Sequence, residues 1–369
     1  MKKIQEYILK GKEVFIGLED SARTWKICAR SGRTVVNETT MPAKYEELRN
    51  YLHHKFPRCR IRIMYEAGFR GFELHDSVVA DGWECIVTPP HTVTEEKCNR
   101  KKNDRNDSRR LARNNENDDY RSCYIPLREQ REDRQVTRLY GQIQKDITRT
   151  CARIRRTLEF HGLDHRLPVG DWNHTNYREA EKQVKTSVTS ESLKFTLERL
   201  FSILMYLRKE RLSVLRQLRT IAKKRPYRKN VERLMSAPGI GFLTAIRLIL
   251  EWGDLSRFER KEEFASFLGL IPSDYSTGEM DRRGHITRQG NRQVRSWLVE
   301  SAWVAIKYDP VLLEKYKAVV SHSGSSKIAI VAVARKLAMK LRAMLLNGES
   351  YEIGLVEQIK SKRLSGKKR

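Results

Sequence analysis

Two short stretches near the N-terminus decide the fold: Val-Phe-Ile-Gly-Leu at 14–18 and Thr-Trp-Lys-Ile-Cys-Ala at 24–29. The first is an apolar run and the second alternates apolar with polar residues, so each predicts a strand. Arg-Ser-Gly-Arg at 30–33 predicts a turn into a third strand, Thr-Val-Val at 34–36. Three adjacent strands joined by short turns indicate an antiparallel edge of a sheet.

Strands alternate with helices after this edge. Tyr and Leu residues at helical spacing predict a helix over 43–55, and Arg-Ile-Arg-Ile-Met-Tyr at 60–65 predicts a strand. A second helix is expected over 69–81 and a further strand over 84–88, which ends at Pro-Pro. The order of elements predicts a mixed α/β sheet with an antiparallel edge.

The charge of the chain indicates its partner. The 369 residues carry 73 Lys and Arg against 46 Asp and Glu, a formal net charge of +27. An excess this large, spread along the chain, is typical of proteins that bind nucleic acid. Structural nucleic-acid-binding proteins share it, so charge alone does not indicate an enzyme. The length allows two or three domains.

Cysteine usage and hydropathy exclude several classes of protein. The six cysteines lie singly, without a Cys-x-x-Cys pair, which argues against a zinc ribbon and for reduced thiols. The N-terminal residues lack an apolar signal core, and no apolar run is long enough to span a bilayer. We expect a soluble cytoplasmic protein without a membrane partner.

The middle of the chain predicts an arm. Apolar residues repeat every three or four positions over 136–158 and again over 193–218, and Arg211 interrupts the second series. This spacing is typical of coiled coils, so two long antiparallel helices are expected to pair with each other or across a dimer. The segment between them, with Gly162, Pro168 and Gly170, is expected to form a long connection at the tip.

The C-terminal part is predicted to be mainly α-helical. Ser-Ala-Pro-Gly-Ile-Gly at 236–241 precedes an apolar helix at 242–252, which is the helix-hairpin-helix pattern. The backbone amides around Gly239 and Gly241 are candidates for holding a DNA phosphate. Further helices are expected at 260–268, 289–306 and 325–346. We therefore divide the chain into 1–125 (α/β domain), 126–226 (coiled-coil arm), 227–348 (C-terminal domain) and 349–369 (basic tail).

Two acids lie inside an intensely basic stretch, residues 97–113. Asp104 and Asp107 are three apart and share one side of a predicted helix. A solvated charged helix explains them, and so does a divalent metal, which prefers oxygen ligands. The basic neighbours are candidates for binding nucleic acid: Lys101, Lys102, Arg105, Arg109 and Arg110.

Acids at the ends of predicted strands favour the metal. Glu19, followed by Asp20, ends the first strand, and Glu66 ends the strand after the first helix. Acids at the carboxyl ends of neighbouring strands, completed by a pair from a helix, can meet at one point. Such an arrangement suits phosphoryl transfer with two Mg²⁺ ions.

The chain resembles the DEDD-type insertion-sequence transposases, a family of bridge-RNA-guided recombinases. The resemblance covers nearly the whole chain. The stretches that carry it are Phe-Ile-Gly-Leu-Glu-Asp-Ser (15–21), Tyr-Glu-Ala-Gly (65–68), Lys-Asn-Asp-Arg-Asn-Asp-Ser-Arg-Arg-Leu-Ala (102–112), Pro-Gly-Ile-Gly (238–241), Phe-Leu-Gly-Leu-Ile-Pro-Ser-Asp-Tyr-Ser-Thr-Gly-Glu (267–279) and Ile-Thr-Arg-Gln-Gly-Asn-Arg-Gln-Val-Arg (286–295).

The resemblance implies a RuvC-like N-terminal domain with an RNase H fold and four metal-binding acids. Three of the family's acids fall on Glu66, Asp104 and Asp107. The first departs from the pattern, because Glu19 stands where the family usually has Asp, with Asp20 next. Successive strand residues point to opposite faces, so one of the two is expected to be the ligand, and Glu19 is favoured.

The resemblance also implies a catalytic serine, which falls on Ser276. By its sequence alone Ser276 is a loop hydroxyl or a helix cap. Ser273 and Thr277 are the alternatives if the alignment slips, and Tyr275 is a conceivable nucleophile. Basic residues that are candidates for holding phosphates follow this loop: Arg282, Arg283, Arg288, Arg292 and Arg295.

The activity that the resemblance implies is DNA recombination. Serine would form a transient 5′-phosphoserine link beside the acids of another protomer, on donor and target double-stranded DNA. A structured guide RNA and a homo-oligomer, a dimer of dimers, are the implied partners. Two alternatives stay open: a metal-dependent nuclease or junction resolvase in which Ser276 is structural, and a nonenzymatic nucleic-acid-binding scaffold.

Overall fold

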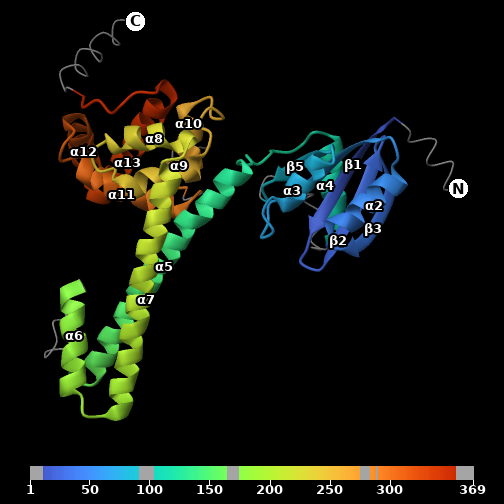
Figure 1. The fold of residues 1–369 in the computed structure, drawn as a ribbon. Coiled ribbons are helices and arrows are strands. Elements are labelled where there is room, and N and C mark those ends of the chain that lie inside the picture. Colours follow the sequence, from blue (N-terminus) through green and yellow to red (C-terminus); the bar gives the residue numbers. More distant parts are fainter. Residues whose placement is uncertain (1–10, 91–103, 164–173, 275–282, 288–289, 355–369) are drawn as a thin grey trace, which may run out of the picture. The chain divides into compact units, whose positions relative to one another are not determined.

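The computed structural model describes residues 11–90, 104–163, 174–274, 283–287 and 290–354. The chain divides into two compact units, Met1–Ile125 and Pro126–Arg369. Figure 1 shows the elements of each unit. None of the helices in the described ranges is both long and apolar enough to cross a membrane.

The N-terminal unit contains a five-stranded sheet in the order β3-β2-β1-β4-β5, drawn in blue in Figure 1. β1 (Glu13–Asp20), β2 (Thr24–Ser31) and β3 (Thr34–Pro42) pair antiparallel. β4 (Arg60–Glu66) pairs parallel with β1, and β5 (Glu84–Thr88) pairs parallel with β4. The mixed sheet with an antiparallel edge is therefore confirmed.

Each face of this sheet carries its own helices. On one face, Ile16 and Leu18 pack with residues of α2 (Tyr45–Lys55) and α3 (Glu73–Ala80) in one buried cluster. On the other face, Met64 packs with Leu111 of α4 (Asp104–Glu116). Because side chains alternate along a strand, the odd residues of β1 and the even residues of β4 face α4.

The second unit begins with a long antiparallel helix pair. In α5 (Arg128–Phe160) and α7 (Glu191–Ala222) the buried apolar residues follow the predicted spacing. Arg211 Nη1 donates to Gln144 Oε1 at 3.0 Å, and Nζ of Lys224, just past the end of α7, donates to Asp133 at 3.0 Å. The two contacts fix the antiparallel register. The polar residue in the seam therefore has a partner on the facing helix.

The connection between these helices contains a helix that the sequence analysis did not predict. α6 (His174–Ser187) buries Ala180 and Val184 against α5 and α7. These two residues are four apart and form a short apolar stripe, the minimum that a helix needs to dock. The glycines and proline before it favoured a loop over the entire segment.

The rest of this unit is a helical core around α13 (Ser326–Asn347). It comprises α8 (Arg225–Met235), α9 (Phe242–Trp252), α10 (Lys261–Phe267), α11 (Arg292–Ala305) and α12 (Pro310–Ser323). Trp252 and Phe264 are fully buried in it, and Leu218 and Ile221 of α7 join the same cluster. The base of the arm is thus part of this core.

Three elements of this region were not predicted from the sequence: α12, β6 and β7. α12 was not predicted, although Asp309 followed by Pro310 is a helix-start signal. A small antiparallel pair, β6 (Pro272–Asp274) and β7 (Arg283–Ile286), flanks the segment expected to be a polar loop between helices. These strands are three and four residues long, too short for a period of two to be visible.

Asp309 fastens the end of the described chain to this core. Its side chain is fully buried and accepts hydrogen bonds from Val311 N at 2.8 Å and Lys340 Nζ at 2.7 Å. The Tyr351 hydroxyl also donates to it. Burial would raise the pKa of Asp309, but the bonds from Lys340 and Tyr351 lower it below the ordinary value.

Replacing Asp309 with Ala is expected to lower the free energy of unfolding by about 3 kcal/mol, because it removes a helix cap and one partner of a buried ion pair. Asp309→Asn keeps the capping oxygen and removes only the charge, so it should cost less. Urea unfolding followed by circular dichroism measures both. An Ala variant as stable as the wild type would show that the fastening is dispensable.

Candidate active site

Glu19 and Glu66 lie at the same edge of the sheet. β1 and β4 are parallel, and Leu18 pairs with Tyr65, so the next residue on each strand is an acid. Neighbouring strands are about 5 Å apart. Glu19 and Glu66 belong to the faces of their strands that α4 covers, and the sheet thereby places two carboxylates side by side beneath this helix.

Gly17 sets how closely α4 approaches the sheet. A Cβ atom at this position would lie 2.1 Å from the carbonyl oxygen of Ser108 and 2.2 Å from the amide nitrogen of Ala112. The backbone of α4 therefore rests directly on the backbone of β1, which only glycine allows. This contact brings Asp107, one residue before Ser108, to the strand ends that carry Glu19 and Glu66.

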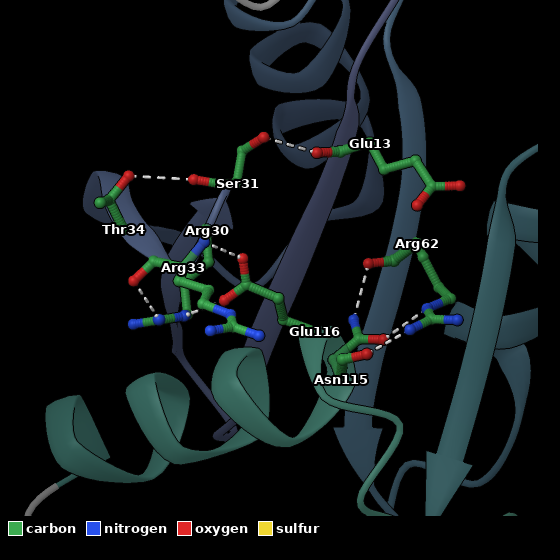
Figure 2. Close-up of polar contacts among 8 residues, drawn as sticks. All are labelled: Glu13, Arg30, Ser31, Arg33, Thr34, Arg62, Asn115 and Glu116. Carbon is green, nitrogen blue, oxygen red and sulfur yellow. Dashed lines mark hydrogen bonds and ion pairs between the residues drawn. The ribbon is translucent and has the colours of Figure 1, made fainter.

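The C-terminal end of α4 is fixed by two polar residues that point in different directions, as Figure 2 shows. Asn115 is fully buried, donates to the carbonyls of Ile16 at 3.1 Å and Arg62 at 2.8 Å, and so joins two neighbouring strands. Glu116 accepts from Arg30 Nε at 2.7 Å, over the antiparallel strands. These bonds hold α4 in one register along the sheet.

Arg110 joins two of the predicted metal ligands. One of its Nη atoms lies 2.9 Å from Glu66 Oε1 and 3.3 Å from Asp107 Oδ1. The Arg110 side chain is 21% exposed, so this contact is partly shielded from water. The two carboxylates therefore approach one common positive charge, although they come from a strand and a helix far apart in sequence.

Asp20 points to the opposite face and has other partners. Its carboxylate accepts from Trp25 Nε1 at 2.6 Å and pairs with Arg70 Nε at 3.0 Å. Burial raises the pKa of Asp20, against the lowering effects of Trp25 and Arg70. This geometry favours Glu19 over Asp20 as the acid that faces α4.

Arg105 and Arg109, two candidates for binding nucleic acid, both bind Glu38 of β3. Arg105 Nε donates to Glu38 Oε2 at 3.0 Å and an Arg109 Nη atom donates to the same oxygen at 2.9 Å. Both arginines nevertheless keep about half of their side-chain surface exposed, 62% and 46%. Phosphate binding by Arg105 and Arg109 remains a prediction, and both already form an ion pair with Glu38.

The Glu38 cluster predicts a dependence of stability on pH. Hydrogen bonds from Arg109 and then Arg105 lower the pKa of Glu38 from 4.5 to about 2. A depressed pKa means that the stabilisation is complete above the unfolded-state value and is lost as pH falls from about 4.5 towards 2. We expect the difference in unfolding midpoint between wild type and Glu38→Gln to be constant near pH 7 and to shrink below pH 4.5. Urea titrations at several pH values test this, and a difference independent of pH contradicts it.

The predicted ligands of Mg²⁺ are carboxylates. Within the described ranges, which leave out the side chain of Asp104, no three His, Cys, Asp or Glu side chains approach closely enough to hold a metal. Glu66 and Asp107 nevertheless share one cationic nitrogen, and the donors are oxygens, as Mg²⁺ requires. The type of donor therefore suits a hard divalent ion, and the Arg110 guanidinium lies between Glu66 and Asp107.

The two glycines of the predicted helix-hairpin-helix pattern have different structural roles. Gly239 has φ +83°, and a Cβ there would lie 2.3 Å from the Ser301 carbonyl oxygen, so this glycine is needed for packing. Gly241 is the N-cap of α9, makes no side-chain cap and has open space where a Cβ would lie. Of the two, Gly241 leaves the amides at the start of a helix accessible to a phosphate.

The predicted serine and part of its basic surroundings lie outside the described residues. These are Tyr275, Ser276, Thr277, Arg282 and Arg288, and likewise Lys101 and Lys102 of the other basic stretch. The side chains of Ser273 and Arg283 are also not described. Arg292 is exposed on α11, whereas Arg295 Nη1 donates to the Gly290 carbonyl at 3.0 Å.

The sequence analysis did not assign a positioning role to Gly17, Arg110 or Asn115. A lone glycine in a strand signals a close backbone approach, which would have identified Gly17. The spacing of Asp107 and Arg110, three apart on a helix, would have predicted their ion pair. Asn115 gave no signal, because a buried Asn in a polar helix looks like a surface residue.

The chain is similar in sequence to several proteins of insertion sequences. The sequence pattern of the family described as "Transposase IS116/IS110/IS902 family" matches residues 231–317. The transposase for insertion sequence element IS1111A of Coxiella burnetii is 26% identical over 73% of each chain. The putative transposase y4qE of Sinorhizobium fredii is 26% identical over 75% of this chain and 73% of that protein. A protein of insertion element IS110 from Streptomyces coelicolor is 33% identical over 32% of this chain and 29% of its own length.

Proposed function

We propose that this chain, which is similar to the IS110/IS116 family transposases, is itself the DNA transposase of an insertion sequence. The observation that carries the proposal is the meeting of Glu66 and Asp107 at one guanidinium beside the end of β1. The net charge of +27 supplies the attraction for DNA.

The fold of the catalytic unit is proposed to be RNase H-like, as in RuvC-like domains. Three features support this assignment: the strand order β3-β2-β1-β4-β5, the antiparallel edge, and the parallel pairing of β4 with β1 on one side and with β5 on the other. The acids lie at the carboxyl ends of adjacent parallel strands, where open α/β sheets usually place their ligands.

Glu19, Glu66, Asp104 and Asp107 are the proposed ligands of two Mg²⁺ ions. Bound there, the ions would activate the attacking oxygen and stabilise the charge on the leaving oxygen of the scissile phosphate. The chain contributes the fixed spacing, because β1 and β4 hold two acids and the Gly17 contact holds α4 against them.

Ser276 is the proposed nucleophile. Its Oγ would form a bond to phosphorus while the bond from phosphorus to the 3′ oxygen breaks, and the serine proton would leave through a base to that oxygen. The product is a 5′-phosphoserine and a free 3′-hydroxyl, which conserves the phosphodiester energy. Attack by the 3′-hydroxyl of another strand then releases serine and completes strand exchange.

The remaining parts of the proposal concern assembly. A structured guide RNA would select donor and target DNA, and a dimer of dimers would bring the acids of one protomer to the serine of another. The α5–α7 pair supports a role in assembly, since it is a long arm whose base is built into the C-terminal core. Its exposed apolar residues on α7 include Phe195, Ile203 and Tyr206.

Mapping the covalent adduct tests the nucleophile. The full chain is incubated with Mg²⁺, guide RNA and donor DNA carrying a nick that traps the intermediate, and the linked peptide is identified by mass spectrometry. The expected adduct is on Ser276, absent in Ser276→Ala and retained in Tyr275→Phe. An adduct on Tyr275 would reassign the nucleophile.

A metal-dependent junction resolvase with a structural serine is the alternative. Strand cleavage by Ser276→Ala at the wild-type rate, with cleavage lost in Glu66→Gln, would favour it over the recombinase.

Gly241 offers a separate test of DNA binding. Gly241→Asp and Gly241→Asn both supply a capping oxygen to α9, so both should keep or slightly raise the stability of the fold. Only Asp adds a negative charge where a phosphate would bind, and we expect it to weaken DNA affinity about tenfold relative to Asn, with the difference shrinking in high salt. Fluorescence anisotropy with labelled duplex measures this. Equal affinities would exclude Gly241 from the interface.

A further inference from the structure

The Glu66–Arg110–Asp107 contact has a consequence for the metal site, and it rests on the proposed function of these acids. A single guanidinium nitrogen touches one oxygen of each acid, at 2.9 and 3.3 Å. Mg²⁺ holds its oxygen ligands at about 2.1 Å, so an ion shared by these acids would draw their oxygens closer together. The guanidinium nitrogen and the ion cannot both lie between the same two oxygens.

We propose that Arg110 is an internal counter-cation that occupies the metal-free site and is exchanged for the divalent ion. In the metal-free chain its positive charge offsets the repulsion between Glu66 and Asp107. When an ion binds, two positive charges are forced close together, and the guanidinium must leave. Metal binding and the Arg110 contact therefore exclude each other.

The exchange requires movement of the Arg110 side chain, because its helix is fixed. Gly17 allows α4 no further approach to the sheet, and Asn115 ties its other end to the carbonyls of Ile16 and Arg62. The Arg110 side chain is 21% exposed and joins its guanidinium to the backbone through a flexible stem. It thus has a route to solvent that leaves the acids in place.

Removing Arg110 is expected to strengthen metal binding. We expect Arg110→Gln to bind Mn²⁺ about tenfold more tightly than the wild type, a usual size for two ligands coupled through one site. Arg110→Lys keeps the positive charge but replaces the planar guanidinium with an ammonium group. Its Mn²⁺ affinity should lie between those of the wild type and Arg110→Gln. The matched control is Arg109→Gln. This variant also removes one positive charge, but from the neighbouring position, where Arg109 pairs with Glu38.

Isothermal titration calorimetry of the full chain with MnCl₂, without DNA, measures these affinities. Thermal unfolding gives a second readout: without metal, Arg110→Gln should unfold at lower temperature than the wild type, and Mn²⁺ should raise its midpoint by more. Arg110→Lys keeps the test decisive if Arg110→Gln fails to fold.

The outcomes separate the two proposals. Equal or weaker Mn²⁺ binding by both Arg110 variants, with binding lost in Glu66→Gln, would overturn the exchange while the metal site stands. Equal affinity changes in Arg109→Gln and Arg110→Gln would reduce the effect to general charge and overturn the exchange as well. Absence of Mn²⁺ binding in every folded variant would overturn both the exchange and the metal site.

Discussion

Glu66→Gln is expected to lower the rate of DNA strand cleavage by about 10³-fold or more, since a lost metal ligand removes several kcal/mol of transition-state stabilisation. Gln is nearly the same size as Glu and keeps one oxygen, so the sheet should fold as before. Glu66 is the last residue of β4, and its carboxylate accepts a hydrogen bond from Arg110 at 2.9 Å. The measurement is single-turnover cleavage of labelled donor DNA.

Asp20→Asn is the matched control for this prediction. Asp20 lies at the same strand edge, but its carboxylate binds Trp25 and Arg70 on the opposite face. Its replacement should affect stability more than cleavage. If Asp20→Asn lost cleavage as severely as Glu66→Gln, while remaining folded, the assignment of the first acid to Glu19 would be wrong.

Gly17→Ala is expected to have the second large effect. The added methyl group would lie 2.1 Å from one backbone atom of α4 and 2.2 Å from another, and neither can rotate away as a side chain can. Overpacking of this kind typically costs up to about 3 kcal/mol, and a backbone contact belongs at the upper end. α4 must lift from β1, and Asp107 moves with it away from Glu66.

Two measurements separate these consequences. Urea unfolding should show the lost stability, and cleavage by the fraction that stays folded should be reduced because the acids no longer converge. Gly68→Ala is the control, since its Cβ would have only an ordinary contact, 3.8 Å from the Glu66 carbonyl oxygen. A Gly17→Ala variant with wild-type stability and cleavage would mean that α4 is not held as closely as described.

The sheet was predictable because its strands carry their own signals. The alternation of Thr24 to Ala29, the glycine turn at 32 and the prolines after Thr88 each reflect a local requirement of strand or turn. The pairing of α5 and α7 was predictable for the same reason, since apolar residues repeat every three or four positions along both segments. α6 and α12 were missed because their buried apolar stripes are short: Ala180 and Val184 in α6, and Val311 and Leu312 in α12.

The site was only partly predictable. Strand ends placed Glu19 and Glu66 side by side, because parallel pairing follows from the order of elements. The direction of Arg110 could not be read in the same way: a basic stretch predicts attraction for phosphate, and which arginines turn inward depends on the height of α4 above the sheet. That height is set by Gly17, 93 residues earlier in the chain.

The antiparallel register of α5 and α7 restricts how the arm can change in evolution. Arg211 of α7 contacts Gln144 of α5, and Lys224, two residues past the end of α7, contacts Asp133 of α5, so the pair is fixed at two levels. Four residues inserted into one helix alone would shift everything beyond them by about 6 Å and rotate it by about 40°. Arms of other lengths are therefore expected to arise by matched insertions in both helices, or by changes confined to the tip that carries α6.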